Sequence, residues 1–333
     1  MNASRRQFLG CLAAGAGAVA LRGRLSAAPG VTYDPEETFF KWKPASEDVW
    51  IGFGQGGNTL VLAGKSAAVL VDCKNAPFGA ALRREAEALG VPIKLVVNTH
   101  HHGDHTGGNH AFSKDLAIVA HEKCKPRIAP QMNRYISQAK EAVLSLSTDE
   151  RACTAKVKVE AKAYHDRMNQ LKAAEFEPKV LVGESKELET GGEKIILRHF
   201  GPGHTDNDLV VFVPRRNVVH CGDLLFYRNH PFLDRESGGS FKGWMSAVKS
   251  IAEMCDEKTL VVPGHGDLTN VKGLREQIEY WERTRDAVAA AIKEGKSKDE
   301  IQKLEIEAFK DYGLPGMKAT TLVAVYEELQ ASP

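Results

Sequence analysis

The run Asn98-Thr99-His100-His101-His102-Gly103-Asp104-His105 constrains the fold and chemistry of this chain more than any other feature. It follows an apolar segment, residues 93–97, which is typical of a buried strand. Ordinary loops need no such density of histidine, and a strand that ends in it delivers several side chains to one edge of a sheet. Histidines with a single carboxylate favour a transition metal over calcium or magnesium. The run therefore predicts a metal site at a strand end.

Three further candidate ligands lie far along the chain, and each comes directly after a glycine. His204, Asp223 and His265 all follow short apolar runs that are rich in β-branched residues. Glycine permits the sharp backbone turn that a crowded site requires. We therefore expect these side chains to complete the ligand set from other strand ends.

Taken together, these positions resemble the metallo-β-lactamase superfamily of metallo-hydrolases over roughly residues 48–270. Its His-x-His-x-Asp-His pattern is matched at residues 100–105, and its later motifs are matched by His204, Asp223 and His265. The resemblance implies an α/β (α+β) fold, the four-layer αββα sandwich of that superfamily, here with a helical insertion and C-terminal helices.

The resemblance also implies a role for each ligand position. One metal ion would be held by His100, His102 and His204, and a second by Asp104, His105 and His265, with Asp223 bridging the two. Asp72, which closes a strand-like segment, matches the first motif of the superfamily; its expected role is to hydrogen-bond and orient a ligand or its loop. His101 alternates away from its neighbours along an extended segment and is expected to be structural or to support the ligands.

The implied function is that of a dinuclear, metal-dependent hydrolase. A metal-bound hydroxide would attack an activated acyl bond in a thioester, ester, lactone or lactam, and Asp104 would orient this nucleophile. Two divalent ions are expected, zinc first, with iron or manganese as alternatives. The chain contains no Gly-x-Ser-x-Gly motif that would point to a serine nucleophile.

The branch of the superfamily is indicated by the residues around Asp223, in Cys-Gly-Asp-Leu-Leu-Phe. This segment looks like the glyoxalase II type. Zinc β-lactamases place a thiolate and then a lysine nearby, whereas Leu224 and Leu225 follow here, which argues against efficient β-lactam hydrolysis. Two alternatives stay open: a mononuclear iron sulfur dioxygenase on the same fold, and a non-enzymatic periplasmic metal-binding protein.

The amino terminus resembles a twin-arginine export signal. Residues 4–9 read Ser-Arg-Arg-Gln-Phe-Leu, a mildly apolar stretch follows up to Leu21, and small residues at 26–28 suit cleavage. We therefore expect residues 1–28 to be a signal peptide and the protein to be periplasmic or exported, meeting a membrane only in transit.

The charge balance argues against nucleic acid as a partner. Residues 1–28 hold four of the 44 basic residues and none of the 43 acidic ones, so the mature chain would have 40 basic residues against 43 acidic ones. The expected partner is a small acyl substrate. The five cysteines beyond Cys11 are scattered and predict no disulfide framework.

The rest of the chain is expected to form one hydrolase domain at 40–270, with a helical insertion at about 130–178, and a C-terminal helical extension at 271–333 packed on the outer sheet. The turn at 54–57 is either a flap over the metals or a plain turn, and the loop 227–244, which carries Trp244, is either a pocket wall or an ordinary surface connection. The expected elements are strands at 49–53, 58–62, 67–71, 93–97 and 194–199, and helices at 79–89, 272–293 and 319–330.

Overall fold

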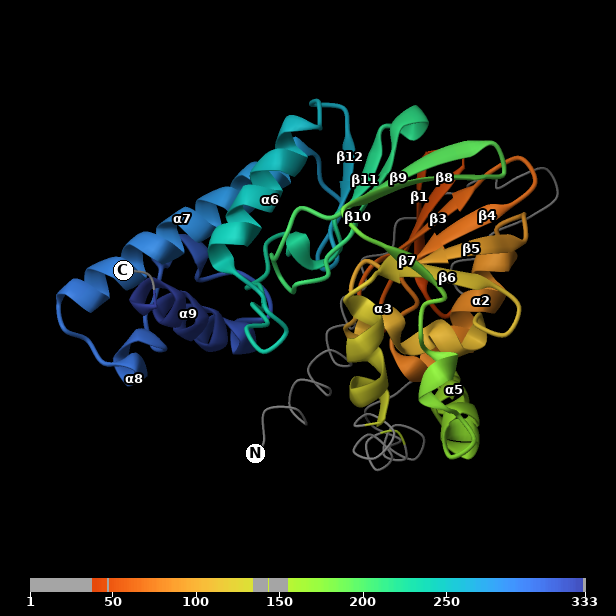
Figure 1. Ribbon diagram of the computed structural model, residues 1–333, viewed down its shortest axis with the longest axis horizontal. Helices are drawn as coiled ribbons and strands as arrows, with labels where there is room; N and C mark the ends of the chain where they lie inside the picture. The colour runs from red at the N-terminus through yellow and green to blue at the C-terminus, as the bar shows by residue number, and fades with distance from the viewer. Residues whose placement is uncertain (1–37, 47, 134–142, 144–154, 332–333) are drawn as a thin grey trace. The chain divides into compact units, whose positions relative to one another are not determined.

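The computed structural model describes residues 38–46, 48–133, 143 and 155–331 (Figure 1). The predicted signal peptide at 1–28 lies outside these residues, as do 134–142 and 144–154 of the predicted insertion. The chain divides into two compact units. The first contains the described residues up to 183 together with 187–195, and the second contains 184–186 and 196 onward.

The first unit is built on a seven-stranded sheet whose strands follow one another in chain order. They are β1 (Lys41–Ser46), β2 (Val49–Phe53), β3 (Thr59–Ala63), β4 (Ala68–Val71), β5 (Ile93–Val97), β6 (Ala117–His121) and β7 (Val180–Val182). Strands β1 to β4 are antiparallel neighbours, and β4 to β7 are parallel. All four residues of β4 are buried, as expected for a strand covered on both faces.

Helices connect the parallel strands of this unit and cover its sheet (Figure 1). The helical elements are η1 (Ala76–Phe78), α2 (Gly79–Glu87), α3 (Gly103–Thr106), η2 (Gly107–Ala111), the residues 124–133, α5 (Ala155–Met168) and η3 (Ala173–Glu175). The apolar face predicted for α2 is confirmed, because Ala81, Leu82 and Ala86 are buried in one core with Ile93 and Ile118 of the sheet.

The second sheet has five strands in the order β12-β11-β10-β9-β8. Their bounds are β8 (Ser185–Thr190), β9 (Glu193–Arg198), β10 (Val210–Val213), β11 (Val218–His220) and β12 (Leu260–Val262). Strand β10 is antiparallel to both β9 and β11, and β11 is parallel to β12. The carboxyl ends of β9, β11 and β12 therefore point toward the same edge of this sheet.

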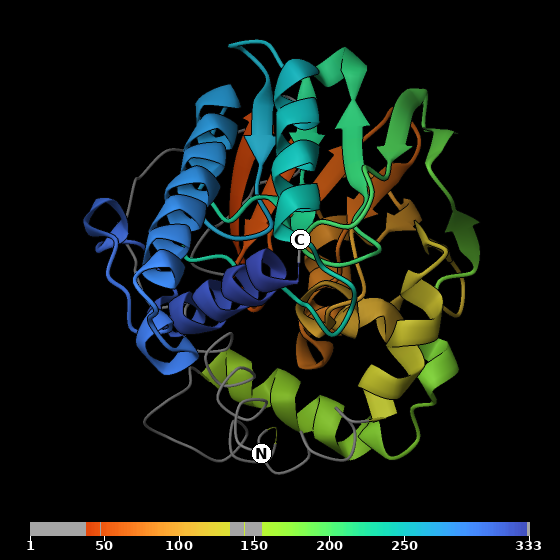
Figure 2. The same cartoon turned by 60° about the vertical axis from the view of Figure 1, so that its left-hand side comes forward.

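Helices α6 and α7 lie side by side in the second unit, next to its strands (Figure 2). The helical elements here are η4 (Pro214–Arg216), η5 (Gly222–Leu224), α6 (Phe241–Glu253), α7 (Val271–Lys293), α8 (Lys298–Ile301), η6 (Glu307–Phe309) and α9 (Pro315–Gln330). Trp244 of α6 and Trp281 of α7 are fully buried, with ring centroids 4.8 Å apart. Helix α9 packs against α7, α8 and α6. Within the C-terminal extension, α7 contacts the sheet at β12, as expected, whereas α9 packs mainly on the other helices.

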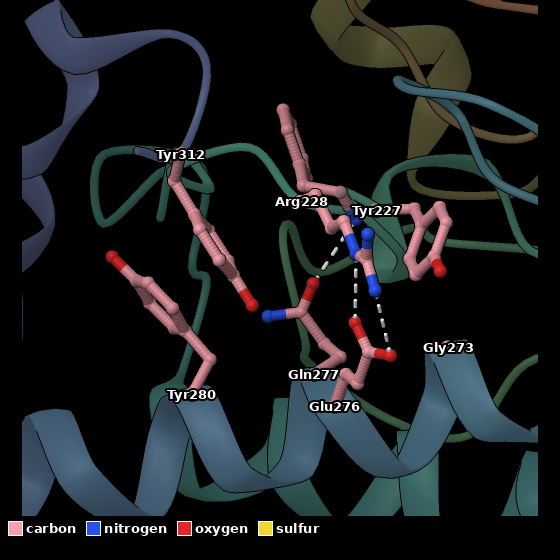
Figure 3. Close-up of a pocket in the computed structure, with 8 residues that line it drawn as sticks. Tyr227, Arg228, Gly273, Glu276, Gln277, Tyr280 and Tyr312 are labelled. Atoms are coloured by element: carbon pink, nitrogen blue, oxygen red, sulfur yellow. Dashed lines mark hydrogen bonds and ion pairs between the residues drawn. The ribbon is translucent and has the colours of Figure 1, made fainter. Parts of the chain in front are cut away.

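The segment after Asp223 is attached to α7, as Figure 3 shows. The backbone N–H of Phe226 donates to Gln277 Oε1 at 3.1 Å, and the Arg228 guanidinium pairs with Glu276 at 3.2 Å. Tyr280 and Tyr312 stack beside this contact, with centroids 5.8 Å apart. These residues line a small pocket that their side chains nearly fill.

The strands and helices expected from the sequence are present, with ends that differ by a few residues. The predicted strand at 58–62 is β3, and the predicted helix at 79–89 is α2. The helix predicted at 319–330 begins earlier, at Pro315, because proline suits the first turn of a helix. Across the described ranges, no helix combines the length and the apolar character that crossing a membrane would require.

Candidate metal centre

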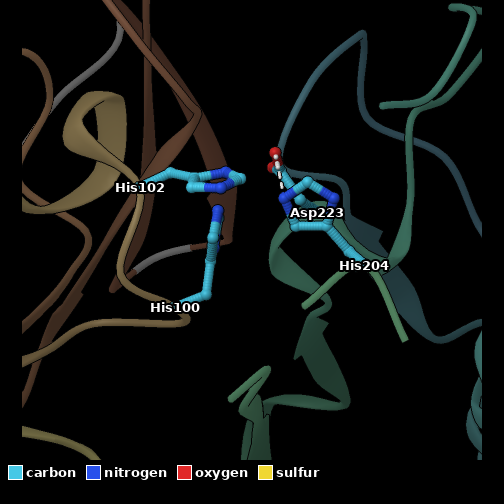
Figure 4. Close-up of side chains that lie close together, drawn as sticks. All are labelled: His100, His102, His204 and Asp223. Carbon is cyan, nitrogen blue, oxygen red and sulfur yellow. Dashed lines mark ion pairs between the residues drawn. The ribbon is translucent and has the colours of Figure 1, made fainter. Parts of the chain in front are cut away.

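Four candidate ligands of the first unit come from one short stretch, which we call the first ligand cluster: His100, His102, Asp104 and His105. Strand β5 ends at Val97, the chain passes through a turn, and α3 begins at Gly103. Figure 4 shows His100 and His102 on this loop, with ring centroids 4.7 Å apart. His105 lies on α3, with its ring centroid 4.3 Å from that of His100. The predicted strand end therefore carries all four side chains.

Asp72 supports this cluster from the end of the neighbouring parallel strand β4. Its Oδ2 lies 2.7 Å from His105 Nδ1, and its Oδ1 accepts a hydrogen bond from the Thr99 backbone N–H at 2.8 Å. All three residues are buried. Because a carboxylate can only accept here, His105 carries its proton on Nδ1, which leaves Nε2 available to a metal ion.

Through Thr99, Asp72 also fixes the tautomer of His100. The Thr99 hydroxyl donates to Asp72 Oδ2 at 2.7 Å, so it can only accept from His100 Nδ1, which lies 3.1 Å away. His100 therefore also presents Nε2. One carboxylate thus fixes the tautomers of two candidate ligands.

The turn at 54–57 is tied down against the first ligand cluster. The Gly57 backbone N–H donates to the Asp104 carbonyl at 3.1 Å, and a Cβ on Gly57 would lie 2.1 Å from the His105 ring. Buried Lys74 holds this turn from behind, because its Nζ donates to the carbonyls of Gly52 and Gly57 at 2.6 Å each. Burial lowers the pKa of Lys74 to about 7, and a neutral amine still offers two N–H donors for these carbonyls.

The second ligand cluster, in the second unit, consists of His204, Asp223 and His265. These residues follow β9, β11 and β12, whose carboxyl ends share one edge of the sheet. His204 Nδ1 donates to the Phe232 carbonyl at 2.5 Å, which leaves Nε2 as its coordinating atom. The ring of His265 stacks on Phe226 with centroids 4.9 Å apart.

One oxygen of Asp223 lies between the two histidines of its cluster. Oδ2 is 3.5 Å from His204 Nε2, the ion pair drawn in Figure 4, and 3.4 Å from His265 Nε2. Gly264 makes this approach possible, because a Cβ there would lie 2.0 Å from Asp223 Oδ1. The sequence shows a glycine before each ligand of this cluster. At position 264 the glycine is necessary because any larger residue would collide with the Asp223 carboxylate.

These spacings test whether the residues suit a metal ion. Ligand bonds of about 2.0–2.2 Å in a tetrahedral zinc site place two donor atoms about 3.3–3.5 Å apart. The two Asp223 distances agree with this value, and so does the 3.5 Å between His105 Nε2 and Asp104 Oδ2. They are longer than an ordinary N–H···O hydrogen bond. The donor set and its geometry within each unit therefore fit a divalent transition ion.

Two further residues of the ligand motifs, His101 and Cys221, are buried. His101 is buried beside His102, with ring centroids 4.6 Å apart. Burial raises the pKa of the Cys221 thiol, which stays neutral at physiological pH. Trp244, at the end of the loop 227–244, is fully buried, its Nε1–H donates to the Leu224 carbonyl at 2.7 Å, and its ring centroid lies 5.4 Å from that of His204.

The sequence did not point to Thr99, Lys74 or the Phe232 carbonyl, which all hold the ligand clusters in place. Thr99 lies inside the histidine run and could have been noticed there, since a hydroxyl next to a ligand often orients it. Lys74 gives no such signal, because lysine is ordinarily a surface residue. A backbone carbonyl carries no sequence signal.

Comparison with known proteins identifies the family. The model of the Metallo-beta-lactamase superfamily matches residues 52–265. The metallo-beta-lactamase IND-1 of Chryseobacterium indologenes is 20% identical over 221 residues, 66% of this chain and 75% of that protein. A hydroxyacylglutathione hydrolase of Synechococcus is 27% identical over 173 residues, 49% of this chain and 46% of that protein. The solved structure of FIM-1 from Pseudomonas aeruginosa, in its mono-zinc form, has a TM-score of 0.54 at 19% identity and covers 73% of this chain and 95% of that chain. The predicted fold class is confirmed: mixed α/β with two sheets and helices, consistent with the αββα sandwich.

Proposed function

Because the chain belongs to the metallo-β-lactamase superfamily, we propose that it is a hydrolase that binds two divalent metal ions and cleaves an activated acyl bond. In this proposal, the first and second ligand clusters act together. One ion would be held by His100, His102 and His204, the other by Asp104, His105 and His265, and Asp223 would be shared between them. Zinc is the expected metal, as in the mono-zinc structure of FIM-1.

The position of Asp223 Oδ2 is the observation that most supports two ions. It lies 3.5 Å from His204 Nε2 and 3.4 Å from His265 Nε2, and the proposal assigns these two histidines to different ions. An oxygen at co-ligand distance from both is what a bridging carboxylate requires. The buried His204 imidazole beside it already has its proton on Nδ1, so that Nε2 is available to a metal ion.

The chemistry divides between the ions and the side chains. When bound, two such ions would lower the pKa of a shared water towards about 7 and would supply positive charge beside the carbonyl oxygen of the substrate. Asp104 accepts a hydrogen bond from the attacking water and holds it in line with the acyl carbon. Asp72 and Thr99 hold the imidazoles of His100 and His105 in one orientation and one tautomer, so that little reorganisation is needed during the reaction.

The residues after the bridging carboxylate favour thioesters, esters or lactones over lactams. Leu224 and Leu225 are buried apolar side chains and offer no cation for a substrate carboxylate. The similarity to hydroxyacylglutathione hydrolase, a glyoxalase II type of enzyme, supports a thioester or related acyl substrate. We also propose that residues 1–28 direct export by the twin-arginine route, on the strength of the Arg5-Arg6 motif.

The proposal is tested by measuring metal content and acyl hydrolysis on the same preparation. Wild-type protein should contain two zinc ions per chain and hydrolyse at least one member of a panel made of a thioester, a lactone and nitrocefin. His100→Ala and Asp104→Ala should lose most of this activity and keep the fold, whereas His165→Gln, a change at a partly exposed helix position, should be neutral.

Different results would point to the rival functions. A single redox-active iron per chain, with consumption of O₂ by a persulfide substrate, would replace hydrolysis by sulfur dioxygenase chemistry. Tight zinc binding without turnover of any acyl substrate would indicate a metal-binding protein. Near-normal activity of Asp104→Ala would refute the assigned mechanism.

A further inference from the structure

His204 is held by a loop that contains none of the seven proposed ligands, residues 231–240, which we call the supporting loop. The Phe232 carbonyl accepts the Nδ1–H of His204 at 2.5 Å. The Asp234 backbone N–H donates to the His204 carbonyl at 3.1 Å. The supporting loop thus fixes both the ring and the backbone of this ligand.

Two further contacts bind the same loop to the residues around His204. The Asp206 backbone N–H donates to the Ser237 carbonyl at 2.9 Å. A Cβ on Gly239 would lie 2.5 Å from the His204 carbonyl oxygen, so the loop backbone passes directly against it. A shift of the supporting loop must therefore move His204.

The carboxylate of Glu328, on helix α9, holds the end of the supporting loop. It accepts the Ser240 hydroxyl at 2.8 Å and the backbone N–H groups of Phe241 and Lys242 at 2.8 and 3.2 Å. These N–H groups open helix α6, where no earlier carbonyl can accept them and where the helix dipole attracts an anion. Glu328 is buried, which is unusual for glutamate and reflects this set of donors.

Helix α9 contacts the supporting loop at two further points. Arg235 Nη1 donates to Glu328 Oε2 at 3.0 Å. Two turns earlier on the same helix, the buried Thr321 hydroxyl donates to the Pro231 carbonyl. Residues seven apart lie on one face of a helix. One face of α9 therefore holds both ends of the supporting loop.

The chain before the loop is fixed to the same region of the protein. Arg228 pairs with Glu276 on α7 (Figure 3), and its carbonyl accepts the Gly313 N–H at 3.0 Å. The His230 N–H donates to the Gly313 carbonyl at 2.9 Å. The loop is therefore anchored on both sides by residues of the C-terminal extension.

From these contacts we propose that Glu328 is a positioning residue for His204, acting from the C-terminal helix through the supporting loop. The C-terminal extension would then help to position a ligand of the metal centre, in addition to packing on the helices of the second unit. The effect on metal binding rests on the proposed function, whereas the effect on the His204 ring does not.

The test uses the full-length protein with Glu328→Ala and Glu328→Gln. Glutamine keeps one acceptor oxygen but places an N–H₂ group against the remaining donors, so its effect should be intermediate. Glu327→Gln is the matched control, because that exposed neighbour pairs with Lys298 outside the loop. Thr321→Val supplies a second, independent perturbation of the loop and keeps the test valid if Glu328→Ala does not fold.

The first measurement is the NMR signal of the His204 ring in metal-free protein labelled with ¹⁵N-histidine, assigned with a His204→Gln variant. Wild type and Glu327→Gln should show a protonated Nδ1 and an unprotonated Nε2. Both Glu328 variants and Thr321→Val should shift or broaden these signals, because the Phe232 carbonyl moves. A general loss of stability would leave the ring signals of the folded state unchanged. Unchanged His204 signals in the folded variants would overturn the proposal.

The second measurement is zinc affinity, by competition with a chromophoric chelator. Glu328→Ala should weaken one of two zinc equivalents on the order of 10-fold, the size expected when the group orienting a ligand is lost. Equal affinity in wild type and Glu328→Ala, despite altered ring signals, would overturn the link from loop to metal. Altered ring signals in a protein that binds no zinc at all would refute the proposed function and leave the positioning of His204 supported.

Discussion

Replacing Gly264 by alanine should disable the second ligand cluster through a single methyl group. The new Cβ would lie 2.0 Å from Asp223 Oδ1, whereas ordinary contacts begin at 3.4 Å, a difference of about 1.4 Å. It would also lie 2.7 and 2.8 Å from the backbone carbon and oxygen of Gly222. Asp223 must therefore move by roughly an ångström or the turn must open.

The size of the effect follows from this displacement. Misplacing a group in an active site by about 1 Å costs on the order of 100-fold in rate, about 2.7 kcal/mol. Overpacking of a buried turn costs a further ~1–3 kcal/mol of stability. We expect Gly264→Ala to lower kcat/KM about 100-fold, to weaken zinc binding, and to lower the Tm by several degrees.

Gly316→Ala is the matched control, because its Cβ would meet no atom within 4 Å in the first turn of α9. Alanine there should be neutral or stabilise by up to ~1 kcal/mol, since it favours the helix. Zinc titration, steady-state kinetics and thermal unfolding should be run on both variants. A folded Gly264→Ala protein with wild-type zinc affinity and turnover would show that the close packing of Gly264 against Asp223 is not needed for metal binding or catalysis.

Further predictions concern the residues that hold the first ligand cluster and the metal itself. Lys74 has a pKa of about 7 in the folded protein against 10.5 in the unfolded chain, so the unfolded state binds more protons between these values. Stability should therefore rise with pH from about 7 to 10.5, by up to ~1.4 kcal/mol per pH unit, and urea unfolding of Lys74→Met should lack this rise. Asp72→Asn should weaken zinc binding ~10- to 100-fold in chelator competition, because an amide N–H₂ cannot accept from His105; unaltered affinity would contradict the orienting role. Removal of metal by a chelator should lower the Tm and zinc should restore it, since free zinc at about 1,000 times its Kd adds ~4.1 kcal/mol; identical melting curves would argue against a metal centre.

The sequence was sufficient wherever a local pattern determines the structure. The apolar run before Asn98 became β5, and the periodic positions Ala81, Leu82 and Ala86 became the buried face of α2. Glycine before a polar residue at a strand end marked His204 and His265, because a tight turn at a crowded site has few solutions. Each unit brings together its own predicted ligands for this reason.

The sequence was insufficient where a residue's role depends on distant chain segments. Trp244 follows a polar loop, and nothing in that local pattern shows that its ring packs with Trp281 in the core of the helices. Glu328 has the local pattern of a surface glutamate, and only the tertiary fold brings it to the start of α6, 87 positions earlier in the chain. Lys74 is buried by the turn whose carbonyls it binds, which no local pattern reveals.

The hydrogen-bond directions in the first unit show that residues which are not ligands also determine whether the candidate ligands can bind metal. Asp72 accepts from His105 directly and from His100 through the Thr99 hydroxyl, so a single carboxylate sets the coordinating nitrogen of both. The proposed function assigns these two histidines to different ions. Since an imidazole in the wrong tautomer presents a proton where the metal should bind, both sites depend on the same carboxylate. The ligand positions can thus be inferred from strand ends, but their readiness to bind metal is set by acceptors that are not ligands: Asp72 in the first unit and the Phe232 carbonyl in the second.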